Sequence, residues 1–237
     1  MPFPPAEAAL EQPNGLLCAG LELTPERVLE AYRGGIFPWF NEGQPVLWWN
    51  PDPRMVLFPE EFRLHRSLRK TLRRGGYVVT CDQAFDRVMQ GCAEPRPDQD
   101  GTWITDEMRA VYGELHRRGV AHSVETWVEG ELVGGLYGLA LGRVFYGESM
   151  FARVTDASKI AFAHLVAQLS RWEFGLIDCQ QETAHLASFG ARPIARAAFL
   201  EHLNRLLHSE PDFTCMEAAC SARRRWCFDP DLAAAWA

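Results

Sequence analysis

An alternation of strand-like and helix-like segments in the second half of the chain most strongly limits the folds open to it. In order, the segments are a hairpin at 122–128 and 132–140 around a Glu129-Gly130 turn, a strand at 143–146, a helix at 156–171, a strand at Leu176 and Ile177, and a helix-like turn ending at Gly190. This order is typical of an α/β (α+β) domain, in which helices cover a sheet. We therefore expect one such domain here.

The N-terminal part differs, because proline interrupts a dense series of aromatic residues at 36–40 and 46–54. Proline removes a backbone donor and excludes a regular helix there. The rings are expected either to form a small core or to stack on a flat ligand such as a nucleobase. We predict a small Pro/Trp-rich domain over residues 1–60 and the larger α/β domain over residues 61–237.

Polar side chains follow the buried strand at Leu176 and Ile177 without a break. They are Asp178, Cys179 and Gln180. A carboxylate and an amide at the end of a buried strand point into the cleft that lies there, which favours a functional site. The alternative is that Asp178 only caps the helix that follows.

A short basic segment stands out in a chain whose net charge is −7. Leucines at every fourth position (Leu64, Leu68 and Leu72) predict a helix over 60–74 with an apolar inner stripe. The outer faces of this helix carry Arg66, Arg69, Lys70, Arg73 and Arg74. A local basic patch on an acidic protein favours contact with a polyanion. The alternative is an ordinary solvated face.

The composition is that of an ordinary globular protein, with 23% charged and 47% hydrophobic residues. No apolar run approaches the roughly 18 residues that cross a bilayer. The N-terminus has no basic segment followed by an apolar stretch, so it does not resemble a secretory signal. We expect a cytoplasmic protein without a membrane partner.

The seven cysteines are scattered, with no Cys-x-x-Cys pair, which argues against a disulfide framework and a zinc knuckle. Reduced thiols are expected. Cys215, Cys220 and Cys227, with His202 and His208 upstream, are the remaining metal candidates, but their spacing fits no common ligand pattern. We therefore predict no metal site.

Five short motifs in a single order carry a family resemblance. They are Gly-Ile-Phe-Pro-Trp-Phe at 35–40, Trp-Trp-Asn-Pro-Asp-Pro-Arg at 48–54, Gly-Thr-Trp-Ile-Thr at 101–105, Gly-Glu-Ser-Met-Phe at 147–151, and Ile-Asp-Cys-Gln at 177–180. Through them the chain resembles the leucyl/phenylalanyl-tRNA protein transferases, from about Asn14 to beyond Gly190. The resemblance implies a GNAT-like acyltransferase domain with a small N-terminal domain.

The resemblance also implies a reaction and its partners. The Leu or Phe of an aminoacyl-tRNA is moved to the α-amine of an acceptor protein that begins with Arg or Lys, which marks the acceptor for degradation. No cofactor or metal is implied, because an aminoacyl ester is already activated.

Roles for individual residues follow from the same resemblance. Trp39 and Trp103 would sandwich the terminal adenine of the tRNA. The pocket for the Leu or Phe side chain would involve Leu136, Phe145, Leu165 and Ile177, with Gly147 and Cys179 near its wall. Independently of the resemblance, the positive charge of the basic helix favours contact with tRNA phosphates through Arg66, Arg69, Lys70, Arg73 and Arg74.

The chemistry requires a deprotonated amine close to the ester carbonyl. Asp178 is the expected electrostatic partner of the incoming ammonium, and Gln180 is expected to orient the amine, because a neutral amide is a poor base. Asp178, water or a tRNA hydroxyl would then take the proton. Glu148 is the candidate to bind the basic side chain of the acceptor. A structural salt bridge is its alternative role.

Two other functions are compatible with parts of this pattern. An acetyl-CoA-dependent N-acetyltransferase would use the same fold, but its pyrophosphate-binding turn is Gly-rich, and residues 150–159 contain no glycine. A non-catalytic RNA-binding module would use Trp39, Trp103 and the basic helix. It would have no need of Asp178 and Gln180 beside an apolar pocket.

Overall fold

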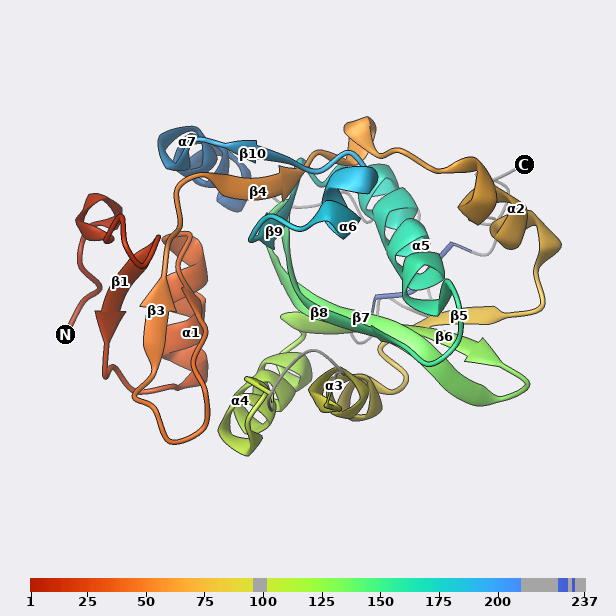
Figure 1. Ribbon diagram of the computed structural model, residues 1–237, viewed down its shortest axis with the longest axis horizontal. Coiled ribbons are helices and arrows are strands. Elements are labelled where there is room, and N and C mark those ends of the chain that lie inside the picture. Colours follow the sequence, from red (N-terminus) through yellow and green to blue (C-terminus); the bar gives the residue numbers. More distant parts are fainter. Residues whose placement is uncertain (96–101, 210–225, 230–231, 233–237) are drawn as a thin grey trace.

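Two β-sheets of unequal size organise the chain in the computed structural model, which describes residues 1–95, 102–209, 226–229 and 232 (Figure 1). In the smaller sheet, β3 (Leu47–Trp49) lies between β1 (Leu16–Ala19) and β2 (Phe37–Pro38). Helix α1 (Pro25–Arg33) packs with this sheet, and Thr24 caps it by accepting the Arg27 N–H, as expected for a Thr-Pro helix start.

The larger sheet has seven strands in the order β10, β4, β9, β8, β7, β6, β5. Their bounds are β4 (Arg54–Leu57), β5 (Val78–Cys81), β6 (Ala121–Val128), β7 (Glu131–Leu141), β8 (Val144–Ala152), β9 (Leu176–Gln180) and β10 (Arg192–Ile194). The predicted hairpin is confirmed as β6 and β7, and the predicted strand–helix–strand unit as β8, α5 (Ala157–Arg171) and β9. The α/β fold class is therefore confirmed.

The large sheet opens between one pair of neighbouring strands. All neighbours are antiparallel except β8 and β9, which run parallel and pair only from Val144 to Tyr146 against Leu176 to Asp178. Beyond this short ladder β8 continues to Ala152 and β9 to Gln180 without pairing to each other. The backbone that follows the ladder therefore faces open space between the two strands.

Helices cover both faces of the large sheet (Figure 1). Helix α5 lies over one face, while α3 (Phe85–Ala93) and α4 (Asp106–Arg117) lie over the other. Successive side chains of a strand point to opposite faces. Phe145 and Ile177 accordingly join the core cluster with α5, whereas Tyr146 and Leu176 join the cluster on the side of α3 and α4.

The predicted basic helix begins later than expected. Residues 59–61 form a short 3-10 helix, and α2 spans only Arg66–Arg74. In between, Phe62 stacks on Phe189 at 5.7 Å between ring centroids, and the Arg63 N–H donates to the Phe189 carbonyl. These tertiary contacts hold the segment outside a helix, so the prediction of a helix from residue 60 was wrong.

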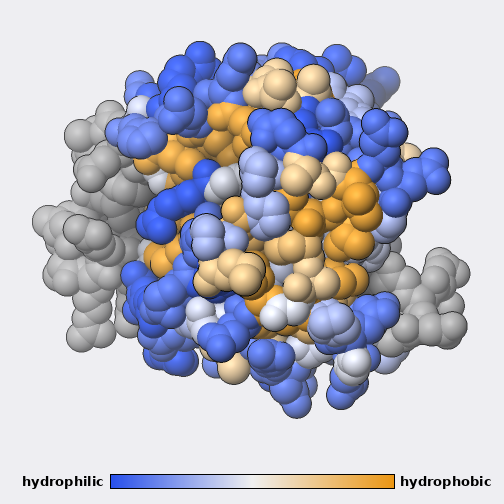
Figure 2. Space-filling view, turned by 90° about the vertical axis from the view of Figure 1, so that its left-hand side faces the viewer, coloured by the Kyte–Doolittle hydropathy of each residue, from blue (hydrophilic) through white to orange (hydrophobic). Residues whose placement is uncertain are grey.

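The expected division at residue 60 stays a prediction. Strand β4 lies N-terminal to that boundary, yet it is an inner strand of the large sheet, between β10 and β9. Side chains from the N-terminal part, such as Tyr32 and Trp48, share one core cluster with Tyr112 of α4 and Phe199 of α7 (Arg196–Leu207). On the face that includes the N-terminal part, apolar side chains also lie among polar ones at the surface (Figure 2).

Cys18, Cys81, Cys92 and Cys179 are not disulfide-bonded, as expected. Cys227 is disulfide-bonded, which corrects the expectation of a reduced thiol there. Disulfide formation depends on which thiols the fold brings within bonding distance, and spacing in the sequence does not set that distance.

Two of the candidate metal ligands, Cys215 and Cys220, lie outside the described residues. Within the described ranges, no three His, Cys, Asp or Glu side chains form a group that could hold a metal ion. No helix in those ranges is long and apolar enough to cross a membrane.

Candidate active site

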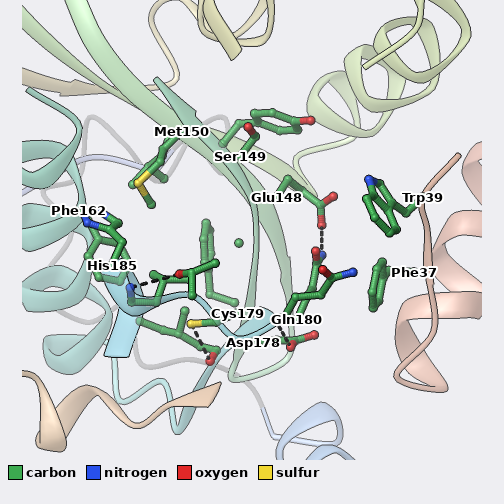
Figure 3. A pocket seen from close by; sticks show the side chains of 18 of the residues that line it. Phe37, Trp39, Glu148, Ser149, Met150, Phe162, Asp178, Cys179, Gln180 and His185 are labelled. Atoms are coloured by element: carbon green, nitrogen blue, oxygen red, sulfur yellow. Dashed lines mark hydrogen bonds between the residues drawn. The ribbon is translucent and has the colours of Figure 1, made fainter. Parts of the chain in front are cut away.

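A cavity of about 510 Å³ lies where β8 and β9 separate (Figure 3). Strands β7, β8 and β9, helix α5, the segment around α6 (Ala184–Ser188) and the aromatic segment at 37–39 contribute to its wall. The structure brings together here all the residues predicted to act in catalysis or to bind substrate. They are Trp39, Trp103, Leu136, Phe145, Gly147, Glu148, Leu165, Ile177, Asp178, Cys179 and Gln180.

One end of the cavity is apolar. Leu136, Phe145, Leu165 and Ile177 are fully buried in one core cluster. Three of them come from neighbouring strands and point to the same face, which is the alternation that β-structure imposes. Sequence reasoning missed other lining residues, including Phe162, Met150 and Leu186. An apolar end of this kind suits a hydrocarbon side chain without hydrogen-bonding groups.

The opposite end is polar and centres on Glu148 of β8. Its Oε1 accepts a hydrogen bond from Gln180 Nε2 at 3.1 Å (Figure 3). The same oxygen accepts a second one from the Tyr32 hydroxyl at 2.6 Å. Its Oε2 accepts one from the Tyr112 hydroxyl at 3.2 Å, and the two tyrosine hydroxyls lie 2.8 Å apart. The carboxylate therefore interacts with three neutral donors rather than with the salt bridge considered as its alternative role.

These surroundings change the acidity of Glu148. Desolvation raises the pKa of its carboxyl group to about 7, with the negative charge of Asp178 acting in the same direction. The hydrogen bonds from Tyr32, Tyr112 and Gln180 oppose this rise, because they stabilise the carboxylate. Such a group gains and loses a proton near neutral pH.

Asp178 lies in the wall of the cavity, but its carboxylate is already paired. Arg54 of β4 donates to it with two parallel hydrogen bonds, Nε to Oδ1 at 2.8 Å and Nη2 to Oδ2 at 2.7 Å. Both residues have an exposed fraction of 0%. The Arg54 guanidinium also lies over the rings of Phe37 at 4.7 Å and Phe199 at 4.6 Å. The negative charge predicted to face the ammonium is thus balanced by a buried cation.

Gln180 receives its orientation from Asp178. Asp178 Oδ1 also accepts the backbone N–H of Gln180 at 2.9 Å, and Gln180 has a φ of 61°. That left-handed conformation is unfavourable for a residue with a side chain, so the surrounding structure has to hold it. Asp178, itself fixed by Arg54, helps to stabilise this backbone conformation through the hydrogen bond from the Gln180 N–H. The Gln180 side-chain amide then donates to Glu148.

Cys179 is an unreactive part of the wall. Burial raises the pKa of its thiol, and the neighbouring Asp178 charge raises it further. The thiol stays protonated at neutral pH, and a protonated thiol is a poor nucleophile. Of the predicted residues, Cys179 therefore contributes shape rather than covalent chemistry.

Two tryptophans line the same cavity from separate segments. Trp39 is 40% exposed, and its ring centroid lies 5.6 Å from that of Trp49. The Trp49 indole N–H donates to the Trp39 carbonyl at 2.7 Å, which fixes the backbone that presents the Trp39 ring. Trp103 lies just ahead of α4 and is half-buried. An exposed ring held by its backbone offers a stacking surface for a planar group.

The basic residues of α2 lie outside the cavity. Leu68 and Leu72 are buried, while the predicted contact residues Arg66, Arg69, Lys70, Arg73 and Arg74 are all exposed. The helix thus has the expected apolar inner stripe and a basic outer face. This surface and the cavity are separate features of the molecule.

Sequence reasoning missed the residues that support the polar end. Arg54 entered the sequence analysis only as the last residue of a motif, and neither Tyr32 nor Tyr112 was predicted to belong to the site. A buried tyrosine needs a partner for its hydroxyl, and a buried arginine needs an anion. These requirements were the available signal, but they do not say which partner is used.

The parallel pair opens over a cavity with one apolar and one acidic, amide-bearing end, which defines an α/β protein whose candidate active site lies where two parallel strands separate. The family model described as leucyl/phenylalanyl-tRNA protein transferase matches residues 56–204, and the model for its N-terminal domain matches residues 22–52. The chain belongs to this family.

Curated relatives agree over nearly the whole chain. A protein from Nitrosomonas europaea named leucyl/phenylalanyl-tRNA–protein transferase is 60% identical over 96% of this chain and 92% of its own. One of the same name from Stutzerimonas stutzeri is 63% identical over 86% of this chain and 92% of its own.

The solved structures that are similar to this chain match it less well than the curated relatives do. L-PGS from Bacillus licheniformis has a TM-score of 0.41 and 10% identity, covering 75% of this chain and 57% of that chain. A GCN5-related N-acetyltransferase from Kribbella flavida has a TM-score of 0.35 and 12% identity, covering 70% of this chain and 60% of that chain.

Proposed function

We propose that this protein transfers Leu or Phe from aminoacyl-tRNA to the α-amine of acceptor proteins that begin with Arg or Lys. One observation carries the proposal: the cavity joins an apolar end to an acidic end beside an amide. The names of the curated relatives support the same reaction. Transfer would mark the acceptor for degradation, in the cytoplasm where charged tRNA is used.

The donor would bind across the cavity. Its Leu or Phe side chain would enter the apolar end formed by Leu136, Phe145, Leu165 and Ile177. The terminal adenine would stack between Trp39 and Trp103, at a gain of about 1 to 3 kcal/mol for each ring. This arrangement would hold the ester carbonyl near Gln180, between the two ends.

The acceptor would approach from the polar end. Glu148 is the carboxylate there with pocket-facing surface, so it would attract the cationic N-terminal residue of the acceptor. Gln180 would orient the amine toward the ester carbonyl. Asp178, held by Arg54, would act by keeping Gln180 in position. Because the ester is already activated, this reaction has no need of a cofactor.

The basic face of α2 would contact tRNA phosphates away from the cavity. Replacing Arg66, Arg69, Lys70 and Arg73 with Ala should weaken binding of full-length tRNA and flatten its dependence on salt. Activity on a short aminoacyl-adenosine donor should be unchanged, since that donor does not extend to the helix. Filter binding at several salt concentrations measures the first effect. Equal losses on both donors would make the helix structural.

Acetyl-CoA-dependent transfer is the competing function. A pyrophosphate would bind at the N-terminus of α5, where backbone amides point outward. Here Asp156 occupies the cap position in a left-handed conformation (φ 66°), and its carboxylate binds Lys159 at 2.8 Å. This ion pair lies at the position a pyrophosphate would take, and residues 150–159 contain no glycine, which argues against CoA.

A direct assay separates the candidates. The protein is incubated with Leu-tRNA and a peptide that begins with Arg, and in parallel with acetyl-CoA and the same peptide. Leucylated peptide in the first reaction alone is the expected result. Acetylated peptide, or tRNA binding without any transfer, would overturn the proposal.

A further inference from the structure

The proposed transfer cannot begin until a proton leaves the acceptor. An α-amino group has a pKa of about 7.7 to 8.0, so it is mainly an ammonium ion at neutral pH. Its nitrogen has no free electron pair to attack the ester until that proton is gone. A group in the cavity with a suitable pKa and access to the amine would speed this step as a general base.

Three titratable groups of the cavity do not suit this role. Both oxygens of Asp178 are occupied by Arg54, and its side chain is fully buried. The pKa of the Cys179 thiol is raised by burial, so no thiolate is present to accept a proton. His185 packs against Phe189 and lies on the other side of the cavity from Glu148 and Gln180 (Figure 3).

Glu148 meets the requirements by its position. It lines the cavity, it retains exposed surface there, and its Oε1 is 3.1 Å from the Gln180 amide that would orient the amine. We propose that Glu148 is the proton acceptor of the transfer reaction and relays protons between the acceptor amine and the leaving tRNA hydroxyl. This inference rests on the function proposed above and adds a catalytic role for this carboxylate.

Glu148 can accept and return each proton that moves during the transfer. The Glu148 carboxylate takes one proton from the ammonium, and the neutral nitrogen then forms a bond to the ester carbon. As the C–O ester bond breaks, protonated Glu148 gives its proton to the ribose oxygen, which leaves as a hydroxyl. The amide nitrogen still carries an extra proton, which passes to Glu148 and then to water.

The groups that face Glu148 tune it for this relay. Tyr32 from α1, Tyr112 from α4 and Gln180 from β9 donate to its oxygens. The Asp178 charge and burial act against ionisation, and together these effects raise the pKa of Glu148 to about 7, close to that of the amine. Tyr137 of β7 is also buried in this wall, and its hydroxyl has no hydrogen-bond partner among the described residues.

The test must separate proton transfer from recognition of the basic side chain. Two acceptor peptides are compared, one with N-terminal Arg and one in which an aminooxy group replaces the α-amine of that Arg. Both carry the guanidinium group, but the aminooxy nitrogen is already neutral at pH 7. Single-turnover rates are measured for the parent and Glu148→Gln at saturating donor and acceptor.

A base should matter only for the peptide that must lose a proton. We expect Glu148→Gln to slow transfer to the Arg peptide by about 100-fold or more at pH 7, the usual range for loss of a general base, and the aminooxy peptide by less than about 5-fold. Equal losses on both peptides would overturn the base role and leave the proposed function intact. A parent protein without any transfer would overturn both.

A second variant tests the tuning without removing the carboxylate. Tyr112→Phe deletes a donor to ionised Glu148, so its pKa should rise and the pH–rate profile should shift to higher pH by about 1 unit. Tyr77→Phe is the matched control, because its hydroxyl bonds the Leu72 carbonyl away from the cavity. An unshifted profile in a folded Tyr112→Phe protein would contradict the proposal.

Discussion

The two ends of the cavity depend on different kinds of contact. The apolar end consists of Leu136, Phe145 and Ile177 on adjacent strands, together with Leu165 on the helix between two of those strands. The polar end joins Glu148 to Tyr32, Tyr112 and Gln180, and supports Gln180 through Asp178 and Arg54. One end follows from the alternation of neighbouring strands, and the other from pairings between distant segments.

This difference predicts different sensitivities. When one side chain of an apolar wall is shortened, packing is lost, but the neighbouring side chains still keep water out of the wall. A deletion in a buried polar network lowers stability further, because it leaves another polar group without its hydrogen-bond partner. Changes at the polar end should therefore affect stability, rate and pH dependence together, in a way that changes at the apolar end do not.

The largest effect is expected from Arg54→Met. It leaves the buried Asp178 carboxylate without its cation, which should lower the free energy of unfolding by about 3 to 5 kcal/mol. Arg192→Ala is the matched control, because it breaks an exposed pair with Glu61 (2.9 Å) that contributes about 1 kcal/mol or less. Denaturant unfolding measures the loss of unfolding free energy in both variants. Equal losses would show that the buried Arg54–Asp178 pair stabilises the fold no more than the exposed pair does.

A smaller but distinct effect is expected from Asp178→Asn. The single-turnover rate at saturating donor should fall by about 100-fold, with donor affinity nearly unchanged, because the Gln180 backbone loses its charged acceptor. This substitution also removes the counter-ion of the buried Arg54, so it is expected to lower stability as well. Rates are therefore compared only where unfolding curves show the variant folded. A normal rate would remove Asp178 from the mechanism.

Substitution of the tryptophans that line the cavity should change ligand affinity more than stability, unlike substitutions at either end. Trp39→Ala and Trp103→Ala should each weaken binding of an aminoacyl-adenosine mimic by about 1 to 3 kcal/mol, through lost stacking. Trp39 is partly exposed, so the stability of its variant should change little. Calorimetric titration gives the affinities. Unchanged binding in both variants would exclude the adenine sandwich.

The smallest effect is a pH-dependent gain in stability for Glu148→Gln. The pKa of Glu148 is raised in the folded state to about 7. Below the unfolded-state pKa both states are protonated and no cost arises. As pH rises toward 7 only the unfolded state ionises freely, so stability falls, and above 7 the full cost remains.

Glutamine does not titrate, so the variant should gain on the parent by about 1 to 2 kcal/mol between pH 5 and pH 8, discounted for partial exposure. Thermal unfolding at both pH values measures this gain. Leu165→Ala, at the apolar end, should lose the same stability at both pH values, because this substitution removes no titratable group. A pH-independent Glu148→Gln difference would contradict the raised pKa.

The sequence alone determined the parts of the molecule that depend on local pattern. The 122–140 hairpin and the strand–helix–strand unit that ends at Gln180 follow from periodicity and turn residues. The ordered motifs also pointed to the residues that line the cavity. Periodicity succeeds here because side-chain direction along a strand or helix is a property of the backbone itself.

Only the tertiary structure decided how the charged groups pair. Asp178 meets Arg54 across 124 positions, and Glu148 meets Tyr32 across 116. The late start of α2 likewise depends on Phe62 stacking on Phe189. A buried charge must find a partner, but any of several distant residues satisfies that requirement equally well in the sequence. The folded arrangement selects one of them: Asp178 pairs with Arg54, while Glu148 accepts hydrogen bonds from neutral donors.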